Sequence, residues 1–221
     1  MKLKVFLLLA VSCIATFGFA QQKPFWNEIQ AFKKKDSLNA PAKGGILFVG
    51  SSSFTKWTEL ENVYKSYGAI NRGFGGSNLV DANYYAKDIV FPYQARQIVI
   101  YSGENDIAGG ASAIETLNRF ATFFTSIRNN QPNVPVIYIS MKQSPSRMKF
   151  ASAVVHANAL IKEYLTHYKA TQFIDVDSKM HNKDGSLRPE LFLPDMLHMK
   201  QPGYDIWIKE ITPYLIKKIQ N

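Results

Sequence analysis

From residue 46 onward, the chain alternates short apolar runs with longer segments in which apolar residues recur at helical spacing. The runs lie at residues 46–49, 69–71, 97–101, 134–139 and 171–176. Most of them are nearly all apolar rather than alternating, which is typical of strands that are covered on both faces. The run at 69–71 is the weakest because it ends on Asn71. The pattern predicts five buried strands.

Helical periodicity fills most of the segments around these runs. It covers residues 25–35, 112–127, 147–168 and 202–219. Ser112 and Glu115 resemble a capping box, in which each side chain bonds the backbone N–H of the other residue. Pro213 should kink or break the last helix, because proline has no N–H and its ring clashes with the preceding turn.

Strands that are joined by helix-length crossovers pair in parallel, because only such a connection returns the chain to the same end of the sheet. The alternation therefore predicts an α/β protein, a three-layer α/β/α sandwich around a five-stranded parallel sheet. No internal repeat and no long linker divides the sequence. We expect residues 21–221 to form one domain.

Residues 1–20 have the pattern of an export signal rather than that of a folded element. Two lysines precede an apolar run at 5–11, and Gly18 and Ala20 provide small residues at the −3 and −1 positions of a cleavage site. We predict a signal peptide over 1–20 and export to the periplasm or the exterior. A membrane-anchoring helix is one alternative, although the run is shorter than the roughly 20 residues that a span needs. Lipidation at Cys13 is another.

Composition narrows the classes of partner and cofactor. Cys13 is the only cysteine, so cleavage after Ala20 would leave no thiol or disulfide. The formal charge is +9, which favours acidic polymers or anionic surfaces. The basic residues are nevertheless scattered, without a nucleic-acid motif, and we expect no nucleic-acid partner. Metal-ligand spacings and nucleotide-binding motifs are also missing from the sequence, so neither a metal nor a cofactor is predicted. The oligomeric state is left open.

Polar clusters follow three of the predicted strands, and a fourth precedes the last helix. They are residues 50–53, 73–77, 103–106 and 195–198, which read GSSS, GFGGS, GEND and DMLH. Parallel sheets bind ligands at the carboxyl ends of their strands. For any one cluster, glycine and serine could simply be turn residues. Together, the clusters supply a serine, a histidine, a carboxylate and oxyanion donors, as acyl transfer requires.

These clusters resemble the four sequence blocks of the SGNH hydrolases, also called GDSL-type esterases and lipases. The blocks occur in the family's order over about residues 46–207. The resemblance implies the flavodoxin-like fold of that family. It also implies Ser52 as the nucleophile, His198 as the base and Asp195 as its acid partner. The backbone of Ser52 and Gly76, together with the Asn105 side chain, would form the oxyanion hole.

The chemistry of the residues supports the same roles. A serine hydroxyl attacks well only when a base accepts its proton, so a histidine is required. His156 and His167 fall in a helical pattern, and His181 lies in a polar loop that we expect to be exposed. Only His198 follows a carboxylate, that of Asp195, by three residues on a predicted loop. The amide of Asn105 can donate to an oxyanion, which an aspartate could not. Asp106 is expected to hold the loop rather than to react.

The first block departs from the family pattern at one position. The family usually reads Gly-Asp-Ser, and here Ser51 replaces the acid. The nucleophile survives, so activity is still expected, but three consecutive serines leave open which one attacks. Ser52 is preferred over Ser51 and Ser53.

The function predicted from the sequence is that of a serine esterase that works through an acyl-enzyme. The family resemblance, together with the predicted export, implies that the enzyme removes acetyl or other small acyl groups from carbohydrate. A short-chain lipase or lysophospholipase is the enzymatic alternative, and a non-catalytic carbohydrate-binding relative is the other. Residues that could line the substrate pocket are Phe54, Trp57, Phe74, Tyr101 and Arg147, although aromatic residues near strand ends are more often core.

Overall fold

The computed structural model describes residues 23–217, so the predicted signal peptide over 1–20 lies outside the described residues. Five parallel strands form one sheet in the order β2-β1-β3-β4-β5. They are β1 (Ile46–Gly50), β2 (Ala69–Gly73), β3 (Gln97–Tyr101), β4 (Val136–Ile139) and β5 (Thr171–Ile174). The predicted fold class is confirmed. Two strands are shorter than their apolar runs: β4 begins only after Pro135, and β5 ends at Ile174.

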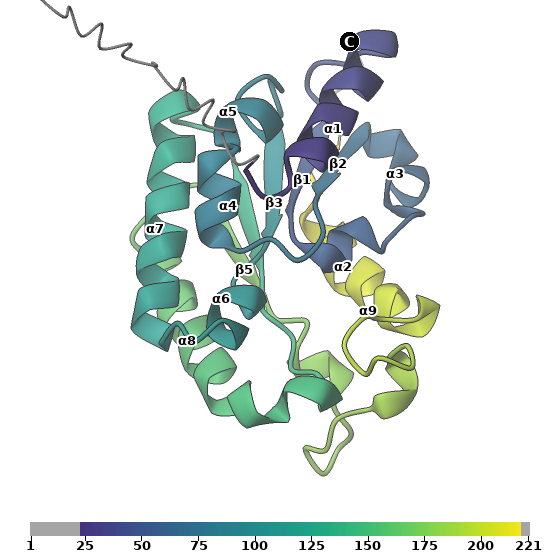
Figure 1. The fold of residues 1–221 in the computed structure, drawn as a ribbon, viewed down its shortest axis with the longest axis vertical. Coiled ribbons are helices and arrows are strands. Elements are labelled where there is room, and N and C mark those ends of the chain that lie inside the picture. The colour runs from purple at the N-terminus through teal and green to yellow at the C-terminus, as the bar shows by residue number, and fades with distance from the viewer. Residues whose placement is uncertain (1–22, 218–221) are drawn as a thin grey trace, which may run out of the picture.

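Helices cover both faces of the sheet (Figure 1). One face carries α1 (Trp26–Leu38), α4 (Leu79–Tyr84), α5 (Ala86–Ile89), α7 (Ala113–Asn130) and α8 (Ala151–Thr166). The other carries α2 (Ser52–Thr55), α3 (Leu60–Val63) and α9 (Gln201–Ile211). The short helix α6 (Glu104–Ala108) follows β3 directly. This arrangement is the expected three-layer sandwich.

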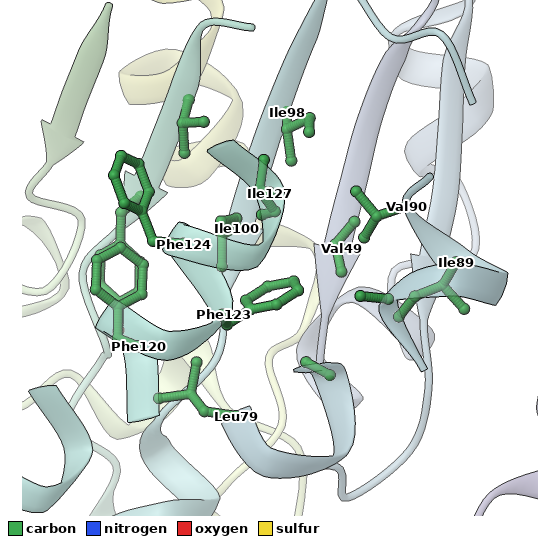
Figure 2. Packing of buried hydrophobic residues seen from close by; sticks show 14 of the residues in the cluster. Val49, Leu79, Ile89, Val90, Ile98, Ile100, Phe120, Phe123, Phe124 and Ile127 are labelled. Atoms are coloured by element: carbon green, nitrogen blue, oxygen red, sulfur yellow. The ribbon is translucent and has the colours of Figure 1, made fainter. Parts of the chain in front are cut away.

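Each central strand sends alternate side chains into two separate cores. In β1, Leu47 and Val49 join the first core, whereas Ile46 and Phe48 join the second. Figure 2 shows the first core, where side chains of α7 such as Phe123 pack towards the strands. Because both faces of the sheet are covered, these strands have no solvent-facing side. Their sequences are therefore continuously apolar rather than alternating.

The caps and breaks that the sequence predicts agree with the helix ends. Ser112 and Glu115 form a complete capping box at the start of α7. The last helix ends at Ile211, and Pro213 lies in the following 3₁₀ turn, η5 (Thr212–Tyr214). The predicted helix at 147–168 starts later than expected, since η2 (Pro145–Phe150) is a 3₁₀ segment.

The sequence pattern did not predict the short helices. They are α2, α3, α4 and α5, between β1 and β3, and α6, after β3. Each of them has four to six residues, which is too short for a helical period to be visible. Three further 3₁₀ turns connect the longer elements: η1 (Lys65–Tyr67), η3 (Ser178–Met180) and η4 (Pro189–Leu191).

Strand register brings the polar clusters to one edge of the sheet. Gly50, the last residue of β1, lies opposite Gly73 of β2 and Tyr101 of β3. The three neighbouring strands therefore end at the same level, and the residues that follow them share one rim. Within residues 23–217, no helix is both long and apolar enough to span a membrane.

Candidate active site

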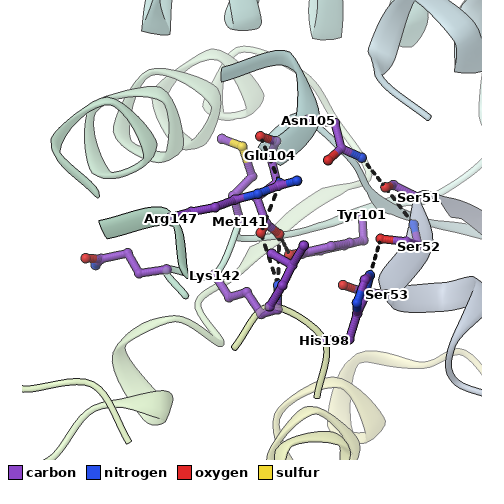
Figure 3. Close-up of polar contacts among 12 residues, drawn as sticks. Ser51, Ser52, Ser53, Tyr101, Glu104, Asn105, Met141, Lys142, Arg147 and His198 are labelled. Atoms are coloured by element: carbon purple, nitrogen blue, oxygen red, sulfur yellow. Dashed lines mark hydrogen bonds and ion pairs between the residues drawn. The ribbon is translucent and has the colours of Figure 1, made fainter. Parts of the chain in front are cut away.

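Three side chains from opposite ends of the chain form a line of hydrogen bonds at this rim. Ser52 begins α2 directly after β1, and its Oγ lies 2.9 Å from Nε2 of His198. The other ring nitrogen, Nδ1, lies 2.6 Å from Oδ2 of Asp195. The structure thus brings together the three residues that were predicted to be catalytic (Figure 3 shows the Ser52–His198 contact).

A tight loop holds Asp195 and His198 in this relation. Residues Phe192 and Met199 form an antiparallel bridge, and the N–H of Leu193 donates to the His198 carbonyl at 2.7 Å. Oδ1 of Asp195 accepts from the backbone N–H of Leu197 and of His198, each at 3.0 Å. One carboxylate oxygen therefore fixes the loop, and the other is left to orient the imidazole.

The surroundings of Asp195 keep its carboxyl ionised. Burial opposes ionisation, but hydrogen bonds from the His198 ring and from the N–H groups of His198 and Leu197 outweigh it and lower the pKa of Asp195 to about 2. An ionised carboxylate can only accept hydrogen bonds. The imidazole proton must then reside on Nδ1, which leaves Nε2 of His198 to accept from the Ser52 hydroxyl.

Of the three consecutive serines, Ser52 alone is hydrogen-bonded to His198 in the described part of the chain. Ser53 is buried, and its carbonyl accepts from the hydroxyl of Tyr204 at 2.9 Å. Oγ of Ser51 accepts from the Ser52 N–H at 2.6 Å and from Nδ2 of Asn105 at 2.8 Å. Ser51, at the position where the family carries an acid, is thus a neutral hydrogen-bond acceptor. It lies between two of the expected oxyanion donors, the Ser52 N–H and the Asn105 amide.

Besides the Ser52 N–H, the expected oxyanion donors are Asn105, in α6 after β3, and Gly76, on the loop after β2. Asn105 donates through Nδ2 to the Ser77 carbonyl at 2.9 Å as well as to Ser51. Gly76 has a φ of +72°, in the left-handed region that favours glycine, although a Cβ there would meet no atom within 4 Å. Within residues 23–217, the Gly76 N–H donates no hydrogen bond. It remains available to a ligand.

Asp106 braces this rim and does not reach the reacting groups. Its Oδ2 accepts from the Leu79 N–H, and its Oδ1 pairs with Arg119, both at 3.0 Å. These contacts tie α6 to α4 and α7. Burial raises the pKa of Asp106, against the hydrogen bonds from Leu79 and Arg119.

A buried charged cluster next to Asn105 was not anticipated from the sequence. Nζ of Lys142 lies 3.1 and 3.0 Å from the two carboxylate oxygens of Glu104, and the Tyr101 hydroxyl donates to the same carboxylate. Arg147 approaches Glu104 from the other side. Burial, followed by the nearby Glu104 charge, raises the pKa of Tyr101 well above its usual value. The sequence held one indication of this buried cluster, because Lys142 follows the buried strand β4 by only three residues.

Other candidate residues lie away from the reaction centre or inside the core. Phe54, Trp57, Phe74 and Tyr101 are at most 1% exposed. They are core residues and not pocket walls.

The expectation that His181 is exposed was wrong: it is half-buried, with Nδ1 2.8 Å from the Asp177 carbonyl. His156 is exposed on α8, and His167 is exposed at the C-cap of that helix. In the described segment 23–217, no group of three or more histidine, cysteine or acidic residues is placed to hold a metal.

In a comparison with protein families, residues 44–206 match the model described as the GDSL-like Lipase/Acylhydrolase family. A comparison with curated proteins gives no match.

Solved structures of similar fold come from several bacteria. A Streptococcus pneumonia protein, provisionally assigned as a platelet activating factor, aligns with a TM-score of 0.74 at 21% identity, over 86% of this chain and 92% of that one. A GDSL-like lipase from Bacteroides thetaiotaomicron gives 0.71 at 20%, over 85% and 96%. A variant of a Geobacillus stearothermophilus acetyl-xylooligosaccharide esterase gives 0.63 at 15%, over 82% and 98%. At these identities the likeness shows a shared fold.

Proposed function

Because the chain belongs to the GDSL-like lipase/acylhydrolase family, we propose that it is an exported serine esterase that removes small acyl groups, acetyl foremost, from carbohydrate or similar alcohols. The observation that carries the proposal is the line of hydrogen bonds from Ser52 through His198 to Asp195, at 2.9 and 2.6 Å. A base on the serine and an acid partner on the base are the requirements for activating a hydroxyl.

Acylation begins when Ser52 Oγ attacks the ester carbonyl and its proton passes to Nε2 of His198. Asp195 accepts from Nδ1 and stabilises the imidazolium that forms. Since its pKa is about 2, Asp195 stays ionised at any pH at which the enzyme would work. A loss of activity on mild acidification would therefore not come from protonation of Asp195.

The tetrahedral intermediate needs donors for its negative oxygen. The Gly76 N–H is free to supply one. The N–H of Ser52 can supply a second when it exchanges its bond to Ser51 for one to the oxyanion. The amide of Asn105 can supply a third when it exchanges its bond to Ser77 and keeps the one to Ser51. Losing one such donor costs about 2.7–4 kcal/mol in transition-state stabilisation.

Collapse of the intermediate expels the alcohol as His198 returns its proton to the leaving oxygen. Water then attacks the acyl-enzyme, with His198 again as the base, and releases the acid and free Ser52. Each proton that leaves a hydroxyl therefore passes through Nε2.

Burial of the aromatic residues supports a small acyl group. A long acyl chain needs an apolar wall, yet the four aromatic side chains nearest the strand ends are at most 1% exposed. The carboxylate of Asp195 is about half exposed, with 47% of its side chain accessible. A site so close to the surface suits a polar alcohol such as a sugar. The acetyl-xylooligosaccharide esterase among the structural neighbours acts on a substrate of this class.

The first test compares hydrolysis of p-nitrophenyl acetate by the wild type and by Ser52→Ala. We expect the variant to lose about 10⁴-fold or more in kcat, because the nucleophile is gone. Ser53→Ala is the matched control and should stay close to the wild type. Activity that survives in Ser52→Ala, or a wild type as inert as the variant, would refute the proposal. A release assay on acetylated oligosaccharides and on esters of increasing acyl length then defines the substrate.

A further inference from the structure

The side chain of Arg147 borders the candidate active site between its two halves. Nη1 lies 3.5 Å from the carbonyl oxygen of Glu104, the residue before Asn105. The preceding residue, Ser146, donates through both its N–H and its hydroxyl to the Met196 carbonyl, at 3.0 and 2.9 Å. The segment that contains Ser146 and Arg147 therefore connects the oxyanion donors to the loop that carries His198. Figure 3 shows the guanidinium beside Glu104, with Asn105 and the serines further along the rim.

The charges at this position do not cancel. Both carboxylate oxygens of Glu104 are already bound by Lys142 at 3.1 and 3.0 Å, and one of them also accepts from Tyr101. Arg147 is 3.6 Å from the nearer oxygen, beyond hydrogen-bond distance. Two cations thus share one carboxylate, and the closer partner is Lys142. The surplus positive charge belongs to Arg147.

This cation is also the accessible one. The Lys142 side chain is 1% exposed, whereas that of Arg147 is 24% exposed. A guanidinium carries five N–H donors, and within residues 23–217 the Arg147 side chain forms its hydrogen bond and its ion pair through Nη1, both to Glu104. The remaining donors form a fork of the kind that binds a carboxylate through two parallel hydrogen bonds.

We infer that Arg147 binds a carboxylate on the alcohol part of the substrate, so that the preferred esters are acylated acidic sugars or other acylated hydroxy acids. The inference rests on the proposed esterase function. It assigns the charge to the alcohol because a small acyl group such as acetyl carries no ionisable group. The excess of basic over acidic residues acts in the same direction, since it attracts anionic substrates at long range.

The test uses two acetate esters that differ in charge, 4-acetoxybenzoate and its methyl ester. Arg147→Gln should lower kcat/KM about tenfold for the anionic ester, mainly through KM, and leave the methyl ester within about twofold. Comparing each variant with the wild type cancels the different reactivity of the two esters. Arg147→Lys should retain part of the preference. Lys209→Gln removes one exposed positive charge from α9 and should leave kcat/KM for both esters unchanged.

Binding to a Ser52→Ala protein separates this inference from the proposed function. That protein should bind 4-acetoxybenzoate more tightly than the methyl ester, and adding Arg147→Gln should abolish the difference. Failure of the wild type to hydrolyse either ester would refute the esterase alone. Equal losses for both esters in Arg147→Gln, no loss for either, or equal binding of the two esters would overturn the carboxylate site.

Discussion

Ser51 is the residue at which this chain departs most informatively from the family pattern. Its hydroxyl oxygen accepts from the Ser52 N–H and from the Asn105 amide, at 2.6 and 2.8 Å. Both donors are needed for the oxyanion in the proposed mechanism. A neutral oxygen can orient them without placing a negative charge beside the developing oxyanion.

Removal of this hydroxyl should cost activity more than stability. We expect Ser51→Ala to lower kcat about fivefold with little change in KM, because the Asn105 amide loses a hydrogen bond worth about 1 kcal/mol that orients it. Ser51→Asp restores the family's carboxylate and keeps an acceptor. It should stay active, because a carboxylate oxygen can accept the same two hydrogen bonds. Wild-type kcat in Ser51→Ala would show that the hydroxyl does not position the amide.

Helix α7 shows how far local sequence controls an element. Ser112 accepts from the Glu115 N–H at 3.2 Å, and the Glu115 carboxylate accepts from the Ser112 N–H at 2.7 Å. These bonds satisfy N–H groups that have no partner within the helix. Backbone and side-chain hydrogen bonds with Ser112 lower the pKa of Glu115.

The capping box predicts a stability effect without a catalytic one. Ser112→Ala should lower the free energy of unfolding by about 1 kcal/mol, which corresponds to a fall in Tm of about 2–4 °C for a domain of this size. Thermal unfolding and kcat/KM for p-nitrophenyl acetate are the measurements. Ser152→Ala, on the exposed surface of α8, is the matched control and should leave both unchanged. A loss of activity in Ser112→Ala would contradict a purely local role.

At the scale of the whole molecule, a buried ion pair joins the ends of two adjacent strands. Glu104 follows β3 and Lys142 follows β4, and their side chains are 8% and 1% exposed. Removing Lys142 would leave the buried Glu104 carboxylate with only Arg147, 3.6 Å away, as a counter-ion. Losing the closer partner of a buried pair costs far more than the intact pair contributes. The pair therefore connects the end of β4 to the rim that carries Asn105, so a change at Lys142 should also affect that rim.

Lys142→Met should lower the free energy of unfolding by about 3–5 kcal/mol, measured by urea denaturation. Adding Glu104→Gln removes the stranded charge and should recover much of the loss. Lys35→Met is the control, because the ion pair of Lys35 with Glu61 is exposed and such pairs contribute about 0–1 kcal/mol. Equal effects of Lys142→Met and Lys35→Met would contradict the assigned burial.

The sequence by itself determined the features that depend on near neighbours. Nearly continuous apolar runs identified the five strands, Ser112 and Glu115 marked the start of α7, and Pro213 marked the end of α9. The order of the polar clusters was enough to indicate the family. Spacing, caps and proline breaks act within a few residues, so they can be read from the chain alone.

Only the tertiary structure decided which groups meet across the sheet. The order β2-β1-β3 and its register place Ser51 beside Asn105, 54 residues away. The same packing pairs Lys142 with Glu104, buries the aromatic residues that were candidates for pocket walls, and leaves Arg147 with surplus charge. Strand order and burial result from many weak contacts between distant segments. No local pattern in the sequence records their sum.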